Sequence, residues 1–388
     1  MMTQNSILIA GGYGVVGQQV ATFIRQRYPE LSLIIAGRNP EKAQSLAQEL
    51  GNARGFQLDT EQPMPLQGIQ PRAVVAVVND PHDYLLMDAV RQGIPFLDVT
   101  RWTERLRESG AKLTDERLTA PVLFSSGWMG GIAAVLAVAA TQTLQTVDRI
   151  DISVLFSTQD KSGPNSVDYM DRLATPFETM IDGQPKRVFP YTDPRTITFP
   201  NGYTTPVYRF DTPDQLTLPH TTGAKTVAAR IAFDDAFSTN LLRFLTRSGI
   251  WTLISGDRFT SLRRSLLYNP GNGASHEIHI TATDRDANGS AKTVTTTIVD
   301  PQGQTHLTAL GTLIQLERLL GLDGAAPPAP DIVYPDTAPQ IRPALQVLEQ
   351  FGVSVSQVDD SAKGALHQPG RSVRPYSLRI WQRSNRRC

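Results

Sequence analysis

The sequence predicts a two-domain protein of the α/β class, in which a doubly wound parallel sheet is followed by a second, α+β domain. Three observations lead to this prediction. The chain has 388 residues, which is more than one hydrophobic core usually serves. Its first third alternates short apolar runs with amphipathic helical patterns, as parallel sheets require. From about residue 148 the pattern changes to strands with one polar face and to long polar loops.

Ten segments of the first 128 residues carry clear strand or helix patterns. Six runs rich in Val, Ile and Leu predict strands that are buried on both faces, at 6–11, 31–38, 53–60, 73–80, 95–100 and 121–127. Spacings of three and four between apolar residues predict helices at 14–28, 39–51, 83–93 and 104–118. In the second helix Asn39 suits the N-cap, Pro40 the first turn and Gly51 the C-terminal stop.

The second domain is expected over residues 129–322. It begins with a buried apolar helix in 131–144 and a strand at 149–157 that has one polar face. Residues 275–301 read as two alternating runs joined by "DRDANG", which is a hairpin signal. A helix follows at 310–321, and the Pro/Ala-rich linker 323–330 leads to another helix at 339–352.

Composition narrows the function classes. The formal net charge is zero, which gives no electrostatic reason to expect a nucleic-acid partner for the whole chain. The single cysteine, Cys388, cannot form an internal disulfide, and no apolar run is long enough to span a bilayer. A soluble, cytoplasmic protein without stable membrane insertion is therefore expected. The tail 361–388 holds six arginines and no acidic residue, and is expected to be disordered; a polyanion-binding arm is the alternative.

A glycine-rich loop joins the first strand to the first helix. Gly12, Gly14 and Gly17 form G-x-G-x-x-G at the start of a βαβ unit, the context in which this motif binds dinucleotides. The pyrophosphate would lie against the free N–H groups at the helix start, and Tyr13, Val15 and Val16 belong to the same loop. The alternative is a tight turn that needs glycines and binds nothing.

The end of the second strand indicates which dinucleotide is bound. NAD-binding proteins usually carry Asp or Glu there, whereas this chain reads "IIAGRN", with Arg38 and Asn39 in that place. An arginine pairs with a 2′-phosphate that a carboxylate would repel. The sequence therefore predicts NADP(H), with Arg38 on the 2′-phosphate and Asn39 beside it. A solvated arginine at a strand end is the other interpretation.

Further candidate cofactor contacts lie at the ends of the next strands, because open parallel sheets bind ligands beyond the carboxyl ends of their strands. Asp59 is expected near the adenine, Asn79 near the nicotinamide ribose, and Asp80 follows Asn79. Each of these residues is also ordinary at the start of a loop, so a purely structural role stays open.

Several of these segments, in this order and spacing, resemble the saccharopine dehydrogenase-like family of NADP-binding oxidoreductases. The resemblance covers residues 1–140 well and is looser beyond them; it rests on "ILIAGGYGVVGQQVA", "IIAGRNPEKAQSLAQEL", "FQLDT", "AVVAVVND", "DAVRQGIPFLDVT" and "FSSGWMGGIAAVLA". It implies a Rossmann domain over 1–128 and an α+β domain inserted before a closing helix. That helix, in about 325–355, would return to the Rossmann domain, and homodimerisation would use the second domain.

Two loops depart from the family's pattern. The chain has "NDPHD" after the fourth strand, where relatives often carry Gly-Pro, and "GWMGG" after the sixth, where they often carry Pro-Gly. Both loops would line the substrate cleft. The resemblance therefore implies pyridine-nucleotide chemistry on a substrate other than the one for which the family is named.

The sequence assigns no catalytic acid or base. It contains no Tyr-x-x-x-Lys, no Gly-x-Ser-x-Gly and no HExxH motif. His276 and His279 in "HEIHI" would point to opposite faces of a strand, so no metal site is predicted. Candidate substrate contacts are instead taken from loops near the expected nicotinamide, each with a solvated or packed role as the alternative: Arg101 (for a carboxylate), Trp128 (as an apolar wall), Lys161, Ser162, Ser166 and Tyr169.

Three functions follow from these observations. The first is an NADP(H)-dependent oxidoreductase that transfers a hydride to or from a C=N or C=O bond of a small amino- or carboxylate-bearing substrate. The second is a non-catalytic NADP-binding redox sensor or assembly factor, which the altered loops and missing proton donor favour. The third is an enoyl or lipid-type reductase on the same fold.

Overall fold

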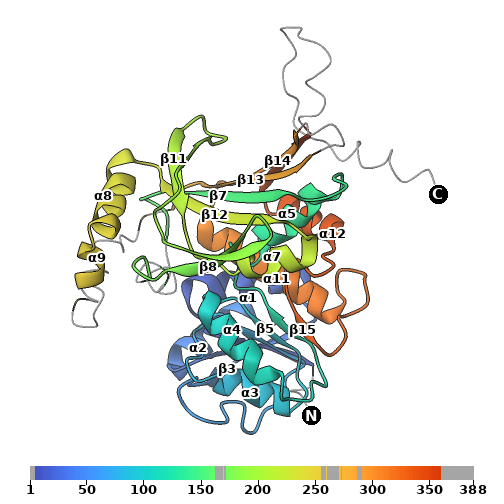
Figure 1. Cartoon of the computed structure of the whole chain (residues 1–388). Coiled ribbons are helices and arrows are strands. Elements are labelled where there is room, and N and C mark those ends of the chain that lie inside the picture. The colour runs from blue at the N-terminus through green and yellow to red at the C-terminus, as the bar shows by residue number, and fades with distance from the viewer. Residues whose placement is uncertain are drawn as a thin grey trace, which may run out of the picture.

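A computed structural model describes residues 5–161, 169, 172–254, 259, 271, 273–285 and 291–359. Two seven-stranded sheets organise this part of the chain, one below the other in Figure 1. The first is parallel and the second is mixed, which confirms the predicted fold class. None of the helices in the described ranges is long and apolar enough to cross a membrane.

The first sheet has the strand order β15-β6-β5-β4-β1-β2-β3, and every neighbouring pair in it is parallel. Its strands are β1 (Ser6–Ala10), β2 (Ser32–Gly37), β3 (Ala53–Gln57), β4 (Ala73–Ala76), β5 (Phe96–Asp98), β6 (Val122–Phe124) and β15 (Ile332–Val333). All six strands predicted for the first domain are present. The order reverses between β1 and β4, where doubly wound sheets bind their ligands.

Helices cover both faces of this sheet. They are α1 (Val15–Arg27), α2 (Pro40–Leu50), α3 (Tyr84–Arg91) and α4 (Thr103–Leu113). The predicted ends of α2 are confirmed: the Asn39 side chain accepts a hydrogen bond from the Lys42 N–H at 2.9 Å, Pro40 begins the helix, and Gly51 ends it with a positive φ of 64°.

The second sheet has the order β10-β11-β12-β7-β13-β14-β16, and β12 and β7 form the one parallel pair among its described strands. Its strands are β7 (Arg149–Phe156), β10 (Arg195–Thr198), β11 (Thr204–Arg209), β12 (Thr226–Phe233), β13 (His276–Arg285), β14 (Ala291–Asp300) and β16 (Ser354–Asp359). The predicted hairpin is confirmed as β13 and β14. A separate hairpin is made by β8 (Phe177–Ile181) and β9 (Gln184–Val188).

The polar face of β7 is buried, although a polar face on a strand usually indicates that this face is exposed to solvent. Asp151 is only 6% exposed and pairs with Arg230 at 2.5 Å, Arg149 at 2.5 Å and Arg195 at 3.1 Å. Burial alone would raise the pKa of Asp151, but the three arginines hold it below its ordinary value. The face is thus neutralised by ion pairs between neighbouring strands.

The helices of the second domain are α5 (Ile132–Thr141), α7 (Asp214–Thr222), α8 (Ala236–Arg247), α9 (Ile250–Leu253), α11 (Gln304–Leu320) and α12 (Ile341–Gln350). The predicted buried helix is α5, which packs under β13 and β14. Helices α8 and α9 project at one side of the molecule in Figure 1.

Helix α11 joins the two domains. It begins at Gln304, six residues before the predicted start, and is buried along most of its length. It packs on α1 and β5 of the first domain and on α5 and β14 of the second. Because α11 faces protein on all sides, its polar residues are also buried, and the simple amphipathic pattern underestimated its length.

The segment after the linker contributes to both sheets. Strand β15 pairs with β6 in the first sheet, as expected of a chain end that returns to the nucleotide domain. Helix α12 then packs on α11 and α5, and β16 pairs with β14 in the second sheet. The predicted domain bounds of 1–128, 129–322 and about 325–355 stay a prediction. The tail 361–388 lies outside the described residues.

Candidate functional site

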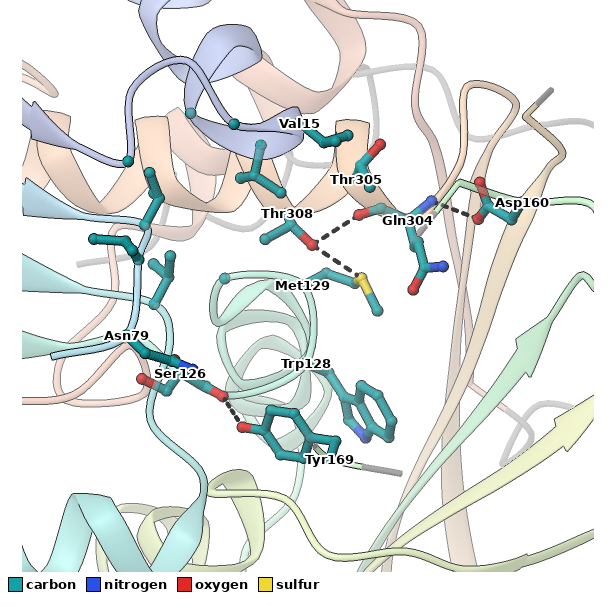
Figure 2. Close-up of a pocket in the computed structure, with 18 of the residues that line it drawn as sticks. Val15, Asn79, Ser126, Trp128, Met129, Asp160, Tyr169, Gln304, Thr305 and Thr308 are labelled. Atoms are coloured by element: carbon teal, nitrogen blue, oxygen red, sulfur yellow. Dashed lines mark hydrogen bonds between the residues drawn. The ribbon is translucent and has the colours of Figure 1, made fainter. Parts of the chain in front are cut away.

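A large cleft of about 850 Å³ lies where the two domains meet. The carboxyl ends of the first-sheet strands and the glycine loop line one side, and strands and helices of the second domain line the other. Figure 2 shows the cleft with Asn79 and Val15 on the first-domain side and Asp160 and Gln304 across from them. This is the place where doubly wound sheets bind nucleotides.

The glycine loop presents an uncapped helix start to the cleft. Gly14 is the N-cap of α1 and makes no side-chain capping bond, and the Gln18 N–H, 2.9 Å from the Gly14 carbonyl, makes the first intrahelical hydrogen bond. The N–H groups of Val15, Val16 and Gly17 therefore have no acceptor within the helix. Gly14, Val15, Val16 and Gly17 all line the cleft, which is the arrangement that binds a phosphate.

The other two motif glycines shape the loop. A Cβ on Gly17 would lie 2.2 Å from the Gly11 carbonyl oxygen, so only glycine lets α1 approach β1 this closely. Gly12 is buried beneath the loop, and its N–H, with that of Gly11, donates to the Ala36 carbonyl. Gly12 therefore sets the turn and does not line the cleft.

At the end of β2 the structure brings Tyr13, Arg38 and Asn39 together. Tyr13 packs on Gly37, and its hydroxyl accepts a hydrogen bond from the Asn39 N–H at 2.9 Å. Arg38 is exposed, lines the cleft and has no ion pair among the described residues. A hollow beside it is lined by Arg38 and also by Lys42, which the sequence reasoning missed. An unpaired arginine and a lysine beside a helix start suit a phosphate.

Of the three predicted strand-end contacts, two line the cleft. Asp59 and Asn79 do so, and the Thr60 hydroxyl ties the two loops together by donating to the Asn79 carbonyl at 2.9 Å. Asp80 is a correction to the predicted set, because the structure turns its side chain inward. It is 3% exposed and accepts a hydrogen bond from the Leu86 N–H at 3.0 Å, at the start of α3.

Arg101 is also corrected, because its guanidinium is already neutralised by protein carboxylates. It is 3% exposed and pairs with Asp83 at 2.5 Å, Asp98 at 3.3 Å and Asp80 at 3.7 Å. Asp83 is held further by Arg105 at 2.8 Å and by Lys112 at 2.6 Å. Arg101 therefore fastens α3 and α4 to the sheet, outside the cleft, and is not placed to receive a substrate carboxylate.

Trp128 and Tyr169, two of the predicted substrate contacts, both line the cleft, and Figure 2 labels both. The Tyr169 hydroxyl lies 3.0 Å from the Arg101 carbonyl oxygen and 3.1 Å from that of Ser126. Lys161 is exposed and does not line the cleft. Ser162 and Ser166 lie outside the described residues.

The loop "GWMGG" is held by Asp214 and by α11. The Asp214 carboxylate accepts a hydrogen bond from the Trp128 N–H at 2.9 Å, and burial raises the pKa of Asp214 to about 6. Gly130 has a φ of +60°, and a Cβ there would lie 2.8 Å from the Thr308 carbonyl oxygen. The departure from the family pattern therefore serves close packing between this loop and α11.

Two groups that line the cleft, Asp160 and Tyr169, have pKa values that burial raises. Burial raises the pKa of Asp160 to about 6, yet its carboxylate accepts hydrogen bonds from the Gln304 N–H at 2.8 Å and the Lys161 N–H at 2.7 Å. It thereby caps the start of α11. Burial also raises the pKa of Tyr169 well above its usual range, so its hydroxyl stays protonated and donates to a backbone carbonyl. Both groups therefore have structural partners.

The sequence reasoning missed most of the second-domain side of the cleft. The residues concerned are on α11, on strand ends and on α9: Gln304, Thr305, Thr308, Phe156, Phe210 and Trp251. These residues belong to no sequence motif and come from segments far apart in the chain. Only the polar residues at the start of α11, Gln304, Thr305 and Thr308, could have indicated from the sequence that this helix borders a site.

The two histidines of β13 do not form a metal site. His276 is fully buried and its two ring nitrogens have no hydrogen-bond partner among the described residues, whereas His279 is half-buried. Burial lowers the pKa of His276 to about 3, so the ring is neutral. No group of three or more potential metal ligands occurs in the part of the chain that the structure describes.

Fold and cleft together define the class: a two-domain protein built like the NAD(P)-dependent oxidoreductases. Apo saccharopine dehydrogenase (L-Glu forming) from Saccharomyces cerevisiae matches 92% of this chain over 99% of its own, with a TM-score of 0.68 and 14% identity. The chain therefore has the saccharopine dehydrogenase fold, as the sequence resemblance implied.

Two further solved structures match with lower TM-scores. A meso-dapdh mutant with DAP from Clostridium tetani covers 89% of this chain and 99% of its own, with a TM-score of 0.43 and 11% identity. Scyllo-inositol dehydrogenase from Lactobacillus casei with NAD(H) covers 92% and 100%, with a TM-score of 0.41 and 11% identity. No family model and no curated protein matches the sequence.

Proposed function

We propose that this protein is an NADP(H)-dependent oxidoreductase that reduces or oxidises a C=O or C=N bond of a small molecule. One observation carries the proposal. The uncapped start of α1 and the unpaired Arg38 face one end of a cleft whose other end is closed by the second domain. Such a cleft can hold a dinucleotide along its first-domain side and a second molecule beside it.

The residues of this chain have separate roles in the proposal. The N–H groups of Val15, Val16 and Gly17 hold the pyrophosphate, and Arg38 with Lys42 holds the 2′-phosphate. Asp59 and Asn79 contact the two riboses or their bases. A nicotinamide bound there supplies or accepts the hydride, with a solvent proton completing a reduction. The protein would then orient the substrate against the nicotinamide and exclude water from the cleft.

The cofactor assignment is tested by titrating NADPH and NADH into the wild type and Arg38→Ala. We expect the variant to lose about 10- to 100-fold in NADPH affinity, the loss of one or two charge-assisted hydrogen bonds, and to change little toward NADH. Arg54→Ala removes an exposed arginine of β3 that does not line the cleft, and serves as the matched control. An unchanged preference in Arg38→Ala would refute the role of Arg38, and a wild type that binds neither nucleotide would refute the whole proposal.

A non-catalytic NADP-binding sensor is the second candidate, and one observation favours it. The hydroxyl of Tyr169 and the carboxylate of Asp160 are both engaged by backbone groups. NADPH consumption over a panel of aldehydes, ketones and imines separates the two functions. We expect turnover; tight NADPH binding without turnover on any compound would favour the sensor. The homodimer stays a prediction.

A further inference from the structure

We propose that the substrate end of the cleft accepts a neutral carbonyl compound with an apolar, ring- or chain-like body, and discriminates against carboxylate groups. This inference rests on the proposed function and names its substrate class. It concerns an apolar part of the cleft, which we call the apolar chamber. The chamber is lined by Trp128, Phe156, Phe210, Leu242, Leu245 and Trp251.

A row of aromatic rings forms one wall of the chamber. Tyr169 stacks on Phe210 with ring centroids 6.3 Å apart, and Phe210 stacks on Trp128 at 5.5 Å. Trp128 then contacts Phe156 at 5.7 Å, and Phe156 contacts Phe233 at 6.0 Å. The rings come from both domains, and all five residues line the cleft. Binding to such a wall is favourable for a ligand that buries apolar surface against it. A strongly hydrated ligand gains little binding free energy there.

Helices α8 and α9 supply further apolar lining residues. On α8, Leu242 is 5% exposed and Leu245 is half-buried, and both line the cleft. Phe244 lies between them in sequence but points outward, with 61% of its surface exposed. Trp251 on α9 is fully buried and also lines the cleft. The inner face of this helix pair therefore closes the chamber with apolar groups.

Charge distribution argues against an anionic or dicarboxylic substrate. Among the described residues that line the cleft, Arg38 is the only cation, and it lies at the nucleotide end. Arg101, the expected partner of a substrate carboxylate, is paired with three aspartates. A carboxylate in the chamber would lose its hydration without gaining a counter-charge from these residues, which is costly.

The two tryptophans add no accessible polar atom to the chamber. Nε1 of Trp128 and Nε1 of Trp251 are shielded from solvent and have no hydrogen-bond partner in the described part of the chain. What these two residues present to a ligand is therefore apolar ring surface. Together with the carbonyl chemistry of the proposed function, an apolar chamber describes a neutral ketone, aldehyde or enone.

The experiment compares two ligands that share one skeleton. The probes are 4-phenyl-2-butanone and 4-phenyl-2-oxobutanoate, which differ by a carboxylate in place of a methyl group. Their affinities for the full-length chain are measured by calorimetry with and without NADPH. We expect the neutral ketone to bind at least tenfold more tightly. An equal or reversed preference, or no binding of either probe, would overturn the inference.

Variants on the two faces of α8 sharpen the test. Leu245→Arg places a cation in the chamber, and we expect it to weaken the ketone and strengthen the oxo acid by about tenfold each. Phe244→Arg makes a comparable change on the outer face and should leave both affinities as in the wild type. A Leu245→Arg protein that folds, as its circular dichroism shows, but keeps the wild-type preference would contradict the assignment of the chamber. A separate NADPH titration decides the proposed function, so the two failures can be told apart.

Discussion

Asp214 illustrates how much of this cleft depends on single buried side chains. It is 1% exposed, and its carboxylate accepts the Trp128 N–H at 2.9 Å. A Cβ on Gly127 would come within 2.4 Å of its Oδ1 atom, so carboxylate and loop are in tight contact. Asp214 therefore positions the Trp128 ring, although it comes from a helix that the sequence did not connect with the site.

Because the pKa of Asp214 is raised in the folded protein, the free energy of unfolding falls as the pH rises. Burial favours the protonated acid, with a folded-state pKa of about 6, so the folded protein holds its proton more tightly than the unfolded chain does. The stabilisation is fully present below the unfolded pKa of about 4 and is lost as the pH rises through 6.

We therefore expect Asp214→Asn, which cannot ionise, to gain stability relative to the wild type between pH 4 and pH 7, by up to about 3 kcal/mol. Denaturant unfolding at several pH values measures the difference. Asp115→Asn makes the same substitution at an exposed position after α4 and is the comparison variant. A difference for Asp214→Asn that stays flat with pH would show that its carboxyl is not protonated in the folded protein.

At the scale of elements, the start of α1 is the feature on which nucleotide binding depends. Its position relative to β1 is set by a backbone contact at Gly17, where a side chain has no room. Because Gly14, Val15 and Val16 precede this contact on the same turn, any shift of the helix moves the N–H groups that face the cleft.

Gly17→Ala tests this contact. We expect the added methyl to destabilise the fold by about 1–3 kcal/mol through overpacking and to weaken NADPH binding at least tenfold. Unfolding curves and NADPH titrations provide the two measurements. Gly110→Ala is the matched control, because a Cβ at this position in α4 meets nothing within 4 Å. That variant should be as stable as the wild type or up to about 1 kcal/mol more stable, and should bind NADPH normally.

At the scale of the whole molecule, α11 holds the domains together and borders the cleft between them. Near its end, Glu317 is 2% exposed and accepts hydrogen bonds from Arg27 Nε at 2.7 Å and the Tyr28 hydroxyl at 2.9 Å. Burial and the Glu317 charge raise the pKa of Tyr28 to about 12, so the hydroxyl remains a donor at neutral pH. This cluster ties α11 to the last turn of α1.

We expect Glu317→Ala to lower the unfolding free energy by about 1–3 kcal/mol, because it leaves Arg27 Nε and the Tyr28 hydroxyl without their acceptor. For a chain of this size the melting temperature should fall by several degrees, about 2–4 °C per kcal/mol. Glu349→Ala, at an exposed position of α12, should melt with the wild type. Equal melting temperatures for both variants would show that the cluster does not stabilise the junction.

The sequence by itself determined the first domain, the glycine loop and the position of Arg38. These features are local: strand and helix periods, caps and motif spacing are all present within a few tens of residues. The hairpin of β13 and β14 and the helix α5 were predictable for the same reason. The family resemblance extended this to the overall fold.

Only the tertiary structure decided that Arg101 and Asp80 are buried and paired within the protein. It also decided that the substrate end of the cleft is apolar. Arg101 is neutralised by Asp83 and Asp98, which lie on different segments, so no pattern around Arg101 could show that its charge is satisfied. The apolar chamber draws its lining residues from the loop after β6, from β7, from the residue after β11, and from α8 and α9. Their side chains meet only when the second sheet folds over the first, because burial and charge pairing depend on neighbours in space and not on neighbours in the chain.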